Sequence, residues 1–255
     1  MNNLPKISII TACYNSEATI KDCLRSIATQ HYENVEHIIV DGGSTDTTLS
    51  LISEDKLRNQ KVVSEKDEGI YDALNKGLKM ASGEIIGFLH SDDMLANNKV
   101  LGEVAKCFQG NLNLECVYGN LIYVDRDNLD QVVRRWQPKL FTKKLLKFGW
   151  MPPHPTVFFR SGVYEKIGNF DIRMKISADY DLMLRYFKVA EKSNVKKIGD
   201  VSIMKCGGAS NRDIWARIKA THEDYIAVKK NDIGGMFTVI MKKCSKLVQY
   251  QFGEK

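Results

Sequence analysis

The sequence Ile85-Ile86-Gly87-Phe88-Leu89-His90-Ser91-Asp92-Asp93 joins an apolar run directly to two adjacent carboxylates. An apolar run that stops at a polar break is typical of a buried strand, and open α/β sheets bind ligands just outside such strand ends. Adjacent carboxylates repel each other, and a Mg²⁺ or Mn²⁺ ion that also binds phosphate oxygens relieves this repulsion. Taken alone, the nine residues fit an ordinary Asp-containing turn better. The rest of the chain reverses that preference in favour of a metal–diphosphate site.

Strand and helix patterns alternate on the N-terminal side of this stretch. Predicted strands cover residues 7–12, 37–40, 62–64 and 85–89, and helical patterns cover residues 17–28, 47–52 and 69–81. This alternation predicts an α/β fold with a parallel, doubly wound sheet. Later in the chain we expect strands at 117–124, 132–136, 156–159 and 201–205, and helices at 98–108, 140–148, 161–167, 178–189, 214–229 and 236–252. The pair at 117–136 resembles a hairpin, so the sheet is expected to change direction there.

Size and composition are those of one domain with an appended subdomain. The chain has 255 residues, 44% of them hydrophobic, and a formal net charge of +6. Its six cysteines show no C-x-x-C spacing, which indicates reduced thiols. The sequence contains no run of 18 apolar residues, so we expect no membrane-spanning helix. Residues 1–6 are polar and lead directly into a predicted strand, so we expect no signal peptide and a cytoplasmic protein.

The positive charge is concentrated in the second half of the chain. Residues 131–164 hold seven Lys or Arg and no acid, and residues 205–255 hold ten Lys or Arg against five acids. Such a surface suits phosphate, nucleic acid or an anionic membrane. Nucleic acid is disfavoured because no RNP, KH or zinc pattern occurs and the basic residues are not interleaved with aromatic ones. We therefore expect no nucleic-acid partner.

Five ordered motifs together resemble glycosyltransferase family 2, the inverting nucleotide-sugar transferases of the GT-A fold. The motifs are Thr11-Ala12-Cys13-Tyr14-Asn15, Asp41-Gly42-Gly43-Ser44-Thr45-Asp46, Asp67-Glu68-Gly69-Ile70-Tyr71-Asp72, His90-Ser91-Asp92-Asp93 and Ser177-Ala178-Asp179-Tyr180-Asp181. The resemblance implies a Rossmann-like, mostly parallel sheet flanked by helices over residues 1–205. Residues 1–95 would form its nucleotide-sugar half, residues 96–205 its acceptor half, and residues 206–255 a basic helical extension.

The resemblance also implies roles for single residues. Asp93 would bind a divalent metal, Mn²⁺ or Mg²⁺, with His154 as a further candidate ligand, and Asp179 would be the general base. Ala178 stands where the family often has Glu, which leaves Asp181 as a less favoured base. Residues expected at the nucleotide are Thr11, Ala12, Tyr14, Asn15, Asp41, Asp67, Ser91 and Asp92. Candidate acceptor contacts are Trp150, His154 and Asp181.

Each role has a structural alternative. Asp41-Gly42-Gly43-Ser44 also fits a Gly-rich turn capped onto a helix, and Asp179 also fits a helix N-terminal acid that interacts with the helix dipole. A lone His is more often structural, and a Trp in an apolar stretch is as often core. Asp181 fits a supporting acid that pairs with Arg185 one turn later.

On this reading the protein transfers a hexose (Glc, Gal or an N-acetyl form) from a UDP-sugar, with inversion, to a glycan. A polyprenyl-diphosphate-linked O-antigen or capsule intermediate is one such acceptor. The alternatives are a protein or soluble glycan acceptor, and a non-catalytic protein that binds nucleotide sugars or anionic surfaces.

The last predicted helix carries an apolar stripe (Phe237, Ile240, Met241, Cys244, Val248) with Lys242, Lys243 and Lys246 toward the other side. A basic amphipathic helix can bind the inner face of the cytoplasmic membrane peripherally. The commoner arrangement is a helix docked on its domain with the lysines in solvent.

Overall fold

The computed structural model describes residues 4–54, 59–206 and 214–251. The part of the extension at residues 207–213 and 252–255 lies outside the described residues. In the first half, the strands and helices are β1 Ile7–Cys13, α1 Ile20–Ala28, β2 Val35–Asp41, α2 Thr48–Glu54, β3 Gln60–Ser64, α3 Ile70–Met80, β4 Ile85–Phe88, β5 Asp93–Leu95 and α4 Val100–Gly110.

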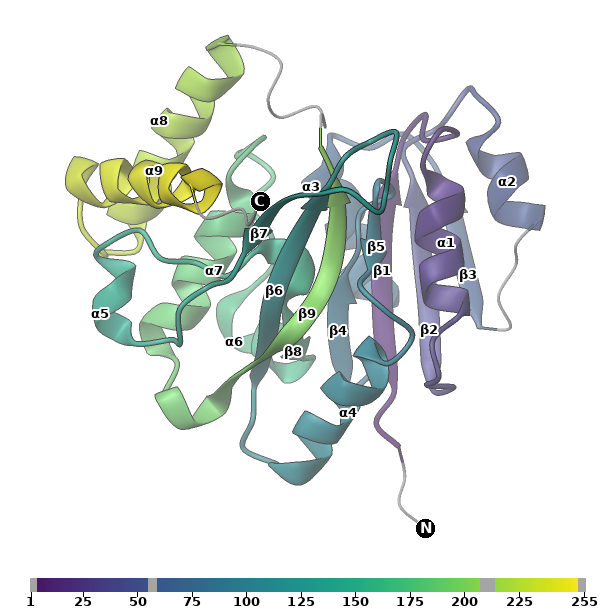
Figure 1. Ribbon diagram of the computed structural model, residues 1–255, viewed down its shortest axis with the longest axis horizontal. Coiled ribbons are helices and arrows are strands. Elements are labelled where there is room, and N and C mark those ends of the chain that lie inside the picture. Colours follow the sequence, from purple (N-terminus) through teal and green to yellow (C-terminus); the bar gives the residue numbers. More distant parts are fainter. Residues whose placement is uncertain (1–3, 55–58, 207–213, 252–255) are drawn as a thin grey trace.

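The second half starts with the long strand of a hairpin and ends in two helices. Its elements are β6 Cys116–Val124, β7 Val132–Trp136, α5 Lys143–Leu146, a 3₁₀ turn at His154–Thr156, β8 Phe158–Arg160, α6 Gly162–Ile167, α7 Ala178–Val189, a 3₁₀ turn at Lys192–Asn194, β9 Val195–Lys205, α8 Ile214–Lys230 and α9 Met236–Gln251. Figure 1 shows the strands as one twisted sheet with helices on both faces.

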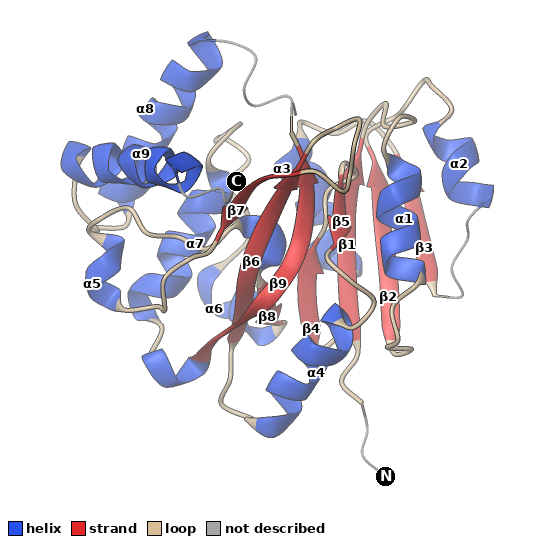
Figure 2. Ribbon diagram, viewed as in Figure 1, coloured by secondary structure: helices blue, strands red, loops and turns tan. Residues whose placement is uncertain are grey.

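The sheet is mixed, with the order β3-β2-β1-β4-β8-β6-β9-β5 in the described chain and β7 paired to β6. β1 pairs in parallel with β2 and β4, as the alternating strand and helix patterns predict. β8 runs antiparallel to both β4 and β6, so the direction of the sheet changes between its halves. The predicted hairpin of β6 and β7 is present. An open mixed sheet with flanking helices, drawn in Figure 2, confirms the expected GT-A-like fold class.

Alternation along β1 divides the core into two layers. Ile10 and Ala12 pack in one cluster with side chains of α3 and α7, whereas Ile7 and Ile9 pack on the other face with side chains of α1 and α4. Gly77 lets α3 lie against β1, because a Cβ there would be only 2.4 Å from Ile10 Cγ2. The carboxyl ends of β1 and β2 meet at one edge of the sheet, where the candidate site lies.

The C-terminal helices are part of this core. Ala227 and Val228 of α8 and Val239 of α9 are fully buried in the same cluster as α7. Figure 1 shows α5, α8 and α9 grouped around α7, on the opposite side of the molecule from α1 and α2. The extension therefore packs directly on the helix that carries Asp179.

Three predicted boundaries were wrong. Asp93 begins the short strand β5, which pairs with β9, where a loop leading to a helix was expected. The strand expected to begin at Val201 begins at Val195, because it runs beside β6 for most of its length. The expected helix at 140–148 shrinks to four residues, Lys143–Leu146, and Gly149 ends this segment at a φ of 71°. All six cysteines are free thiols, as expected.

Candidate active site

A cavity of about 520 Å³ opens where β1 and β4 end. This volume lies in the range of small-molecule sites. Six of the residues expected at a nucleotide line the cavity: Ala12, Tyr14, Asn15, Asp67, Ser91 and Asp92. The sequence motifs that contain them follow β1, β3 and β4, and the strand order β3-β2-β1-β4 brings them together.

Hydrogen bonds between loops hold the cavity wall. The Oγ atoms of Ser16 and Ser91 are 2.9 Å apart, so the loop after β1 is joined to the loop after β4. Asn15 adopts a left-handed conformation with a φ of 46°, which Asn tolerates better than most residues. Its backbone N–H donates to Ser44 Oγ at 2.8 Å, and its Oδ1 accepts from the Thr45 N–H at 2.9 Å. The Asn15 side chain therefore fixes the loop.

The structure does not bring Thr11 and Asp41 into the cavity lining. Thr11 is fully buried, and its Oγ1 lies 2.9 Å from His37 Nε2. The Asp41 carboxylate is also buried and accepts bonds from the backbone N–H groups of Gly43 and Ser44 and from the hydroxyls of Ser44 and Ser64. Burial alone would raise the pKa of Asp41, but these bonds outweigh it and lower the pKa. In this structure Asp41 caps its own turn.

Asp67 lies close to the glycine turn. A Cβ on Gly42 would be 2.6 Å from Asp67 Oδ2 and 3.5 Å from Tyr14 Cδ2, so glycine is needed there for these side chains to approach. Asp67 Oδ1 accepts the N–H of Gly69 at 2.8 Å, just before α3 begins. The motif that contains Asp41 thus contributes to the site mainly through Gly42.

Asp93 is fully buried and is not among the residues that line the cavity, whereas Asp92, next to it in sequence, lines it. Neither of its carboxylate oxygens has a hydrogen-bond partner within the described chain. Burial, and secondly the charge of Asp92, raise the pKa of Asp93 well above its ordinary value. A buried carboxylate without partners is costly, and a divalent cation would relieve the cost.

The residues present fit a metal that relies on its substrate for ligands. No cluster of three or more His, Cys, Asp or Glu side chains that could hold a metal occurs in residues 4–54, 59–206 and 214–251. Mg²⁺ and Mn²⁺ commonly use one or two carboxylates and complete their shell with phosphate oxygens and water. Asp93, with Asp92 beside it, meets that requirement.

Asp179 is held by Tyr71 in the first turn of α7. The Tyr71 hydroxyl lies 3.2 Å from Asp179 Oδ1 and 2.6 Å from the carbonyl oxygen of Ile176. The backbone N–H of Tyr180 donates to the same Oδ1 at 2.8 Å. Tyr71 follows Ile70, which lines the cavity, so one turn of α3 touches both the cavity and Asp179. The Asp179 carboxylate is half-buried, which leaves it partly open to an acceptor.

Glu223 of α8 anchors the segment that leads into Asp179. Its carboxylate accepts the backbone N–H groups of Lys175, Ile176 and Ser177 at 3.1, 2.8 and 2.9 Å. Glu223 is almost fully buried. The sequence motifs did not indicate Glu223, because an acid in a predicted helix carries no signal of a contact 46 residues away.

His154 is buried among aromatic rings and does not line the cavity. It stacks on Phe88 with ring centroids 5.1 Å apart and meets His90 at 5.7 Å. Burial lowers the pKa of His154 to about 4, and burial also lowers the pKa of His90. His154 Nε2 has no hydrogen-bond partner within the described chain. A neutral imidazole with a free nitrogen fits a ligand role, yet its packing also fits a core residue.

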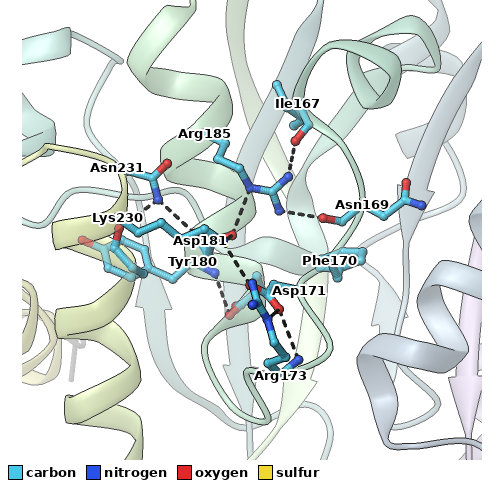
Figure 3. A network of polar contacts seen from close by, with 12 residues as sticks. Ile167, Asn169, Phe170, Asp171, Arg173, Tyr180, Asp181, Arg185, Lys230 and Asn231 are labelled. Atoms are coloured by element: carbon cyan, nitrogen blue, oxygen red, sulfur yellow. Dashed lines mark hydrogen bonds and ion pairs between the residues drawn. The ribbon is translucent and has the colours of Figure 1, made fainter.

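The other two acceptor candidates are tied into the protein. The Trp150 indole donates to the carbonyl oxygen of Lys139 at 3.1 Å and packs on Phe141 and Phe187. Asp181 is fully buried. Figure 3 shows Asp181 among its partners, with Arg185 Nε at 2.9 Å and Asn231 Nδ2 at 2.9 Å. The predicted Asp181–Arg185 pair is therefore confirmed, and Asp181 does not face an acceptor.

Two basic residues that the sequence did not single out also line the cavity. Arg126 comes from the turn between β6 and β7, and Lys205 ends β9. Lys205 also pairs with Asp22. Lys205 begins the basic stretch 205–255, whereas Arg126 precedes the basic stretch 131–164. A turn Arg and a strand-end Lys are ordinary surface residues by sequence, so only the fold shows them at the cavity.

The fold and the cavity define an α/β protein that takes a polar ligand at the carboxyl ends of its strands. The chain belongs to glycosyl transferase family 2, whose model matches residues 8–167. It is similar to the PGL/p-HBAD biosynthesis glycosyltransferase of Mycobacterium bovis (strain BCG / Pasteur 1173P2), with 32% identity over 211 residues, which cover 81% of this chain and 80% of that protein. The expected family is confirmed.

Solved structures support the fold. S. aureus TarS 1-349, solved in complex with UDP-GlcNAc, matches with a TM-score of 0.69 and 20% identity over 89% of this chain and 66% of that one. The mannosyltransferase PcManGT from Pyrobaculum calidifontis, in complex with GDP-Man and Mn²⁺, matches with a TM-score of 0.64 and 18% identity over 100% of this chain and 77% of that one. Among the described residues, no helix is both long and apolar enough to cross a bilayer.

Proposed function

We propose that this protein is an inverting glycosyltransferase that moves a hexose from a UDP-sugar to a glycan acceptor, with Asp179 as general base. The observation that carries the proposal is the turn of α3 at Ile70 and Tyr71. It joins the donor-sized cavity to a half-buried carboxylate at the start of α7.

The cavity suits a nucleotide diphosphate. Tyr14 and Asp67 lie at one wall, on either side of Gly42, where an aromatic ring and a carboxylate suit a base and its N–H groups. Arg126 and Lys205 supply positive charge for phosphates. UDP is favoured because TarS, a structural neighbour, binds UDP-GlcNAc. The GDP-Man complex of the other neighbour makes GDP the comparison to test.

A divalent metal fits Asp93, with Asp92 beside it. Bound there, Mn²⁺ or Mg²⁺ would neutralise the charge that gathers on the leaving diphosphate. The protein contributes the buried, unpartnered carboxylate of Asp93. Tyr71 and the N–H of Tyr180 orient Asp179 Oδ1, and the other oxygen is available for proton transfer.

The reaction needs one proton transfer in the protein. As the acceptor hydroxyl oxygen forms its bond to the anomeric carbon, the bond from that carbon to the diphosphate oxygen breaks, and UDP leaves from the opposite face. Asp179 takes the hydroxyl proton. The product therefore has inverted configuration at the anomeric carbon. A lipid-linked glycan, such as an O-antigen or capsule intermediate, is the acceptor we propose.

Calorimetry with UDP, GDP and ADP, with and without Mn²⁺, tests the donor assignment. We expect Mn²⁺-dependent UDP binding in the wild type and its loss in Asp93→Ala. Asp179→Asn should keep UDP affinity and lose transfer. UDP affinity that is unchanged without Mn²⁺ and in Asp93→Ala would refute the metal assignment. Loss of UDP affinity in Asp179→Asn would refute the base assignment.

A further inference from the structure

The apolar stripe of α9 faces solvent instead of the domain. Met236, Phe237 and Ile240 are 51%, 59% and 51% exposed. The helix docks through its other side, where Val239 is fully buried and Lys242 is buried against Asp224 at 2.6 Å. Val248 and Lys246, which belong to the same sequence pattern, lie outside the residues whose side chains are described. The commoner arrangement, with an inward stripe and solvated lysines, is therefore not found at Phe237, Ile240 and Lys242, whereas Lys243 is exposed.

A segment about ninety residues earlier extends this exposed stripe. Phe148, which follows α5 and is 49% exposed, meets Phe237 edge to face with ring centroids 6.1 Å apart. A hydrogen bond beside this contact joins the two segments, since the Thr238 hydroxyl donates to the backbone carbonyl oxygen of Lys147 at 3.0 Å. Gly149 permits it, because a Cβ there would lie 2.5 Å from the backbone N of Lys242. Met236, Phe237, Ile240 and Phe148, which we call the apolar ledge, thus form one surface.

Three exposed lysines lie within four residues of ledge residues in the sequence. Lys144 and Lys147 on the α5 segment and Lys243 on α9 are exposed. In the described chain, neither Lys144 nor Lys147 forms an ion pair. The stretch 131–164, which contains the α5 segment, holds no acid. Exposed Phe and Ile side chains accompanied by exposed lysines match the interface of an anionic bilayer, where rings enter the acyl boundary and ammonium groups meet headgroup phosphates.

We propose that the apolar ledge and its lysines bind this protein peripherally to membranes of anionic phospholipid. Each exposed Lys near such a surface contributes roughly 1 kcal/mol, about a fivefold gain in partitioning. Phe148 and Phe237 add apolar area that enters the interface without crossing the bilayer. The surface lies on the same side of the molecule as α7, the helix that carries Asp179. The binding itself does not depend on the transfer reaction.

Vesicle co-sedimentation of the full chain tests the proposal. We compare phosphatidylcholine vesicles with vesicles that contain phosphatidylglycerol. The wild type should bind only the anionic ones, and less so at high salt. Phe148→Ser with Phe237→Ser, and separately Lys144→Glu with Lys147→Glu, should each reduce partitioning about tenfold or more. Leu112→Ser, at an 84% exposed Leu in the turn between α4 and β6, is the matched control and should bind like the wild type.

Three vesicle-binding results would overturn the proposal: no binding by the wild type, unchanged binding by the double Phe variant, or equal loss in Leu112→Ser. Light scattering decides whether a second copy covers the ledge instead. A wild-type dimer that becomes monomeric in the double Phe variant would also overturn it. UDP calorimetry and the thermal midpoint should be unchanged in all variants, since the altered side chains are exposed and far from the donor cavity. This separates failure of membrane binding from failure of the proposed transferase.

Discussion

Glu223→Gln should lower kcat more than it raises KM for the donor. The Glu223 carboxylate accepts three backbone N–H groups, of Lys175 through one oxygen and of Ile176 and Ser177 through the other. A Gln amide has one acceptor oxygen, so it keeps at most two of these bonds and turns an NH₂ group toward the third donor. The segment that positions Asp179 then loses part of its anchor.

The size of the effect follows from those bonds. A hydrogen bond to a charged group contributes about 1.5–3 kcal/mol, so Glu223→Gln should lower the free energy of unfolding by about 2–3 kcal/mol. Glu223→Ala leaves all three donors unpaired in a buried place and should lower it by roughly 4–5 kcal/mol. The Gln variant therefore remains folded in a protein with a stability of about 5–15 kcal/mol, and it is the informative one.

The assay is steady-state transfer with varied UDP-sugar, well below the thermal midpoint. A shift of about 1 Å in a catalytic group can cost about a hundredfold in rate, so we expect kcat to fall about 10- to 100-fold. KM for the donor should change less than about threefold, because residues 175–177 do not line the cavity. Glu223→Asp keeps the charge and should recover part of kcat.

Asp224→Asn is the matched control for Glu223→Gln. Asp224 is the next residue on α8, is equally buried, and binds Lys242 of α9 instead of the segment before α7. We expect a similar loss of stability with kcat nearly unchanged. Full kcat in Glu223→Gln would refute the positioning argument. An equal fall of kcat in both variants would show that general loosening of α8, and not the anchor, is responsible.

Further predictions concern pH, a buried charge network and phosphate binding. Burial lowers the pKa of His37 to about 3, against about 6.5 when unfolded, so stability due to the neutral ring is present above about pH 6.5 and is lost as the pH falls toward 3. Between pH 6 and pH 5 the free energy of unfolding of the wild type, measured by urea denaturation, should fall by about 1.4 kcal/mol more than that of His37→Gln. Parallel curves of unfolding free energy against pH for the two proteins would contradict this. Asp181→Asn should lower the free energy of unfolding by about 3–5 kcal/mol in urea denaturation, because Arg185 and Lys230 lose a buried counter-charge. The control Arg173→Ala, at an exposed residue, should lower it by less than about 1 kcal/mol. Arg126→Ala should weaken UDP about tenfold in calorimetry while leaving uridine affinity unchanged, and equal losses would place Arg126 at the base instead.

The cavity lining could be predicted well because its signals in the sequence are local. Buried strands of β-branched residues end at Asn15, Ser91 and Asp92, and parallel strands bring such ends to one edge. The Asp181–Arg185 pair was predictable for the same reason, since residues four apart share a helix face. Asp41 could not be assigned, because a carboxylate before two glycines looks the same whether it faces a ligand or caps its own turn.

The second half of the chain depends on contacts between distant segments. The stripe of α9 was correct as a pattern, but periodicity does not say which face of a helix docks. Here the buried Lys242–Asp224 pair, with the Lys242 ammonium 3.5 Å from the centre of the Tyr180 ring, turns that stripe outward. β5 was missed because three residues are too few for a pattern, and its pairing with β9 involves residues more than a hundred positions away.

Hydrogen bonds join the loop that carries Asp67 to the segment that carries the proposed base, Asp179. Lys175 Nζ donates to the carbonyl oxygen of Glu68 at 2.9 Å, so the segment before α7 is tied to the loop that carries Asp67. Tyr71 joins the same two parts, but its hydroxyl has one hydrogen for two acceptors, Ile176 O and Asp179 Oδ1. While Asp179 is ionised, that hydrogen favours the carboxylate. If Asp179 takes a proton, as the proposed mechanism requires, the Ile176 carbonyl becomes the better acceptor, and the Tyr71 hydroxyl hydrogen can turn from one oxygen to the other.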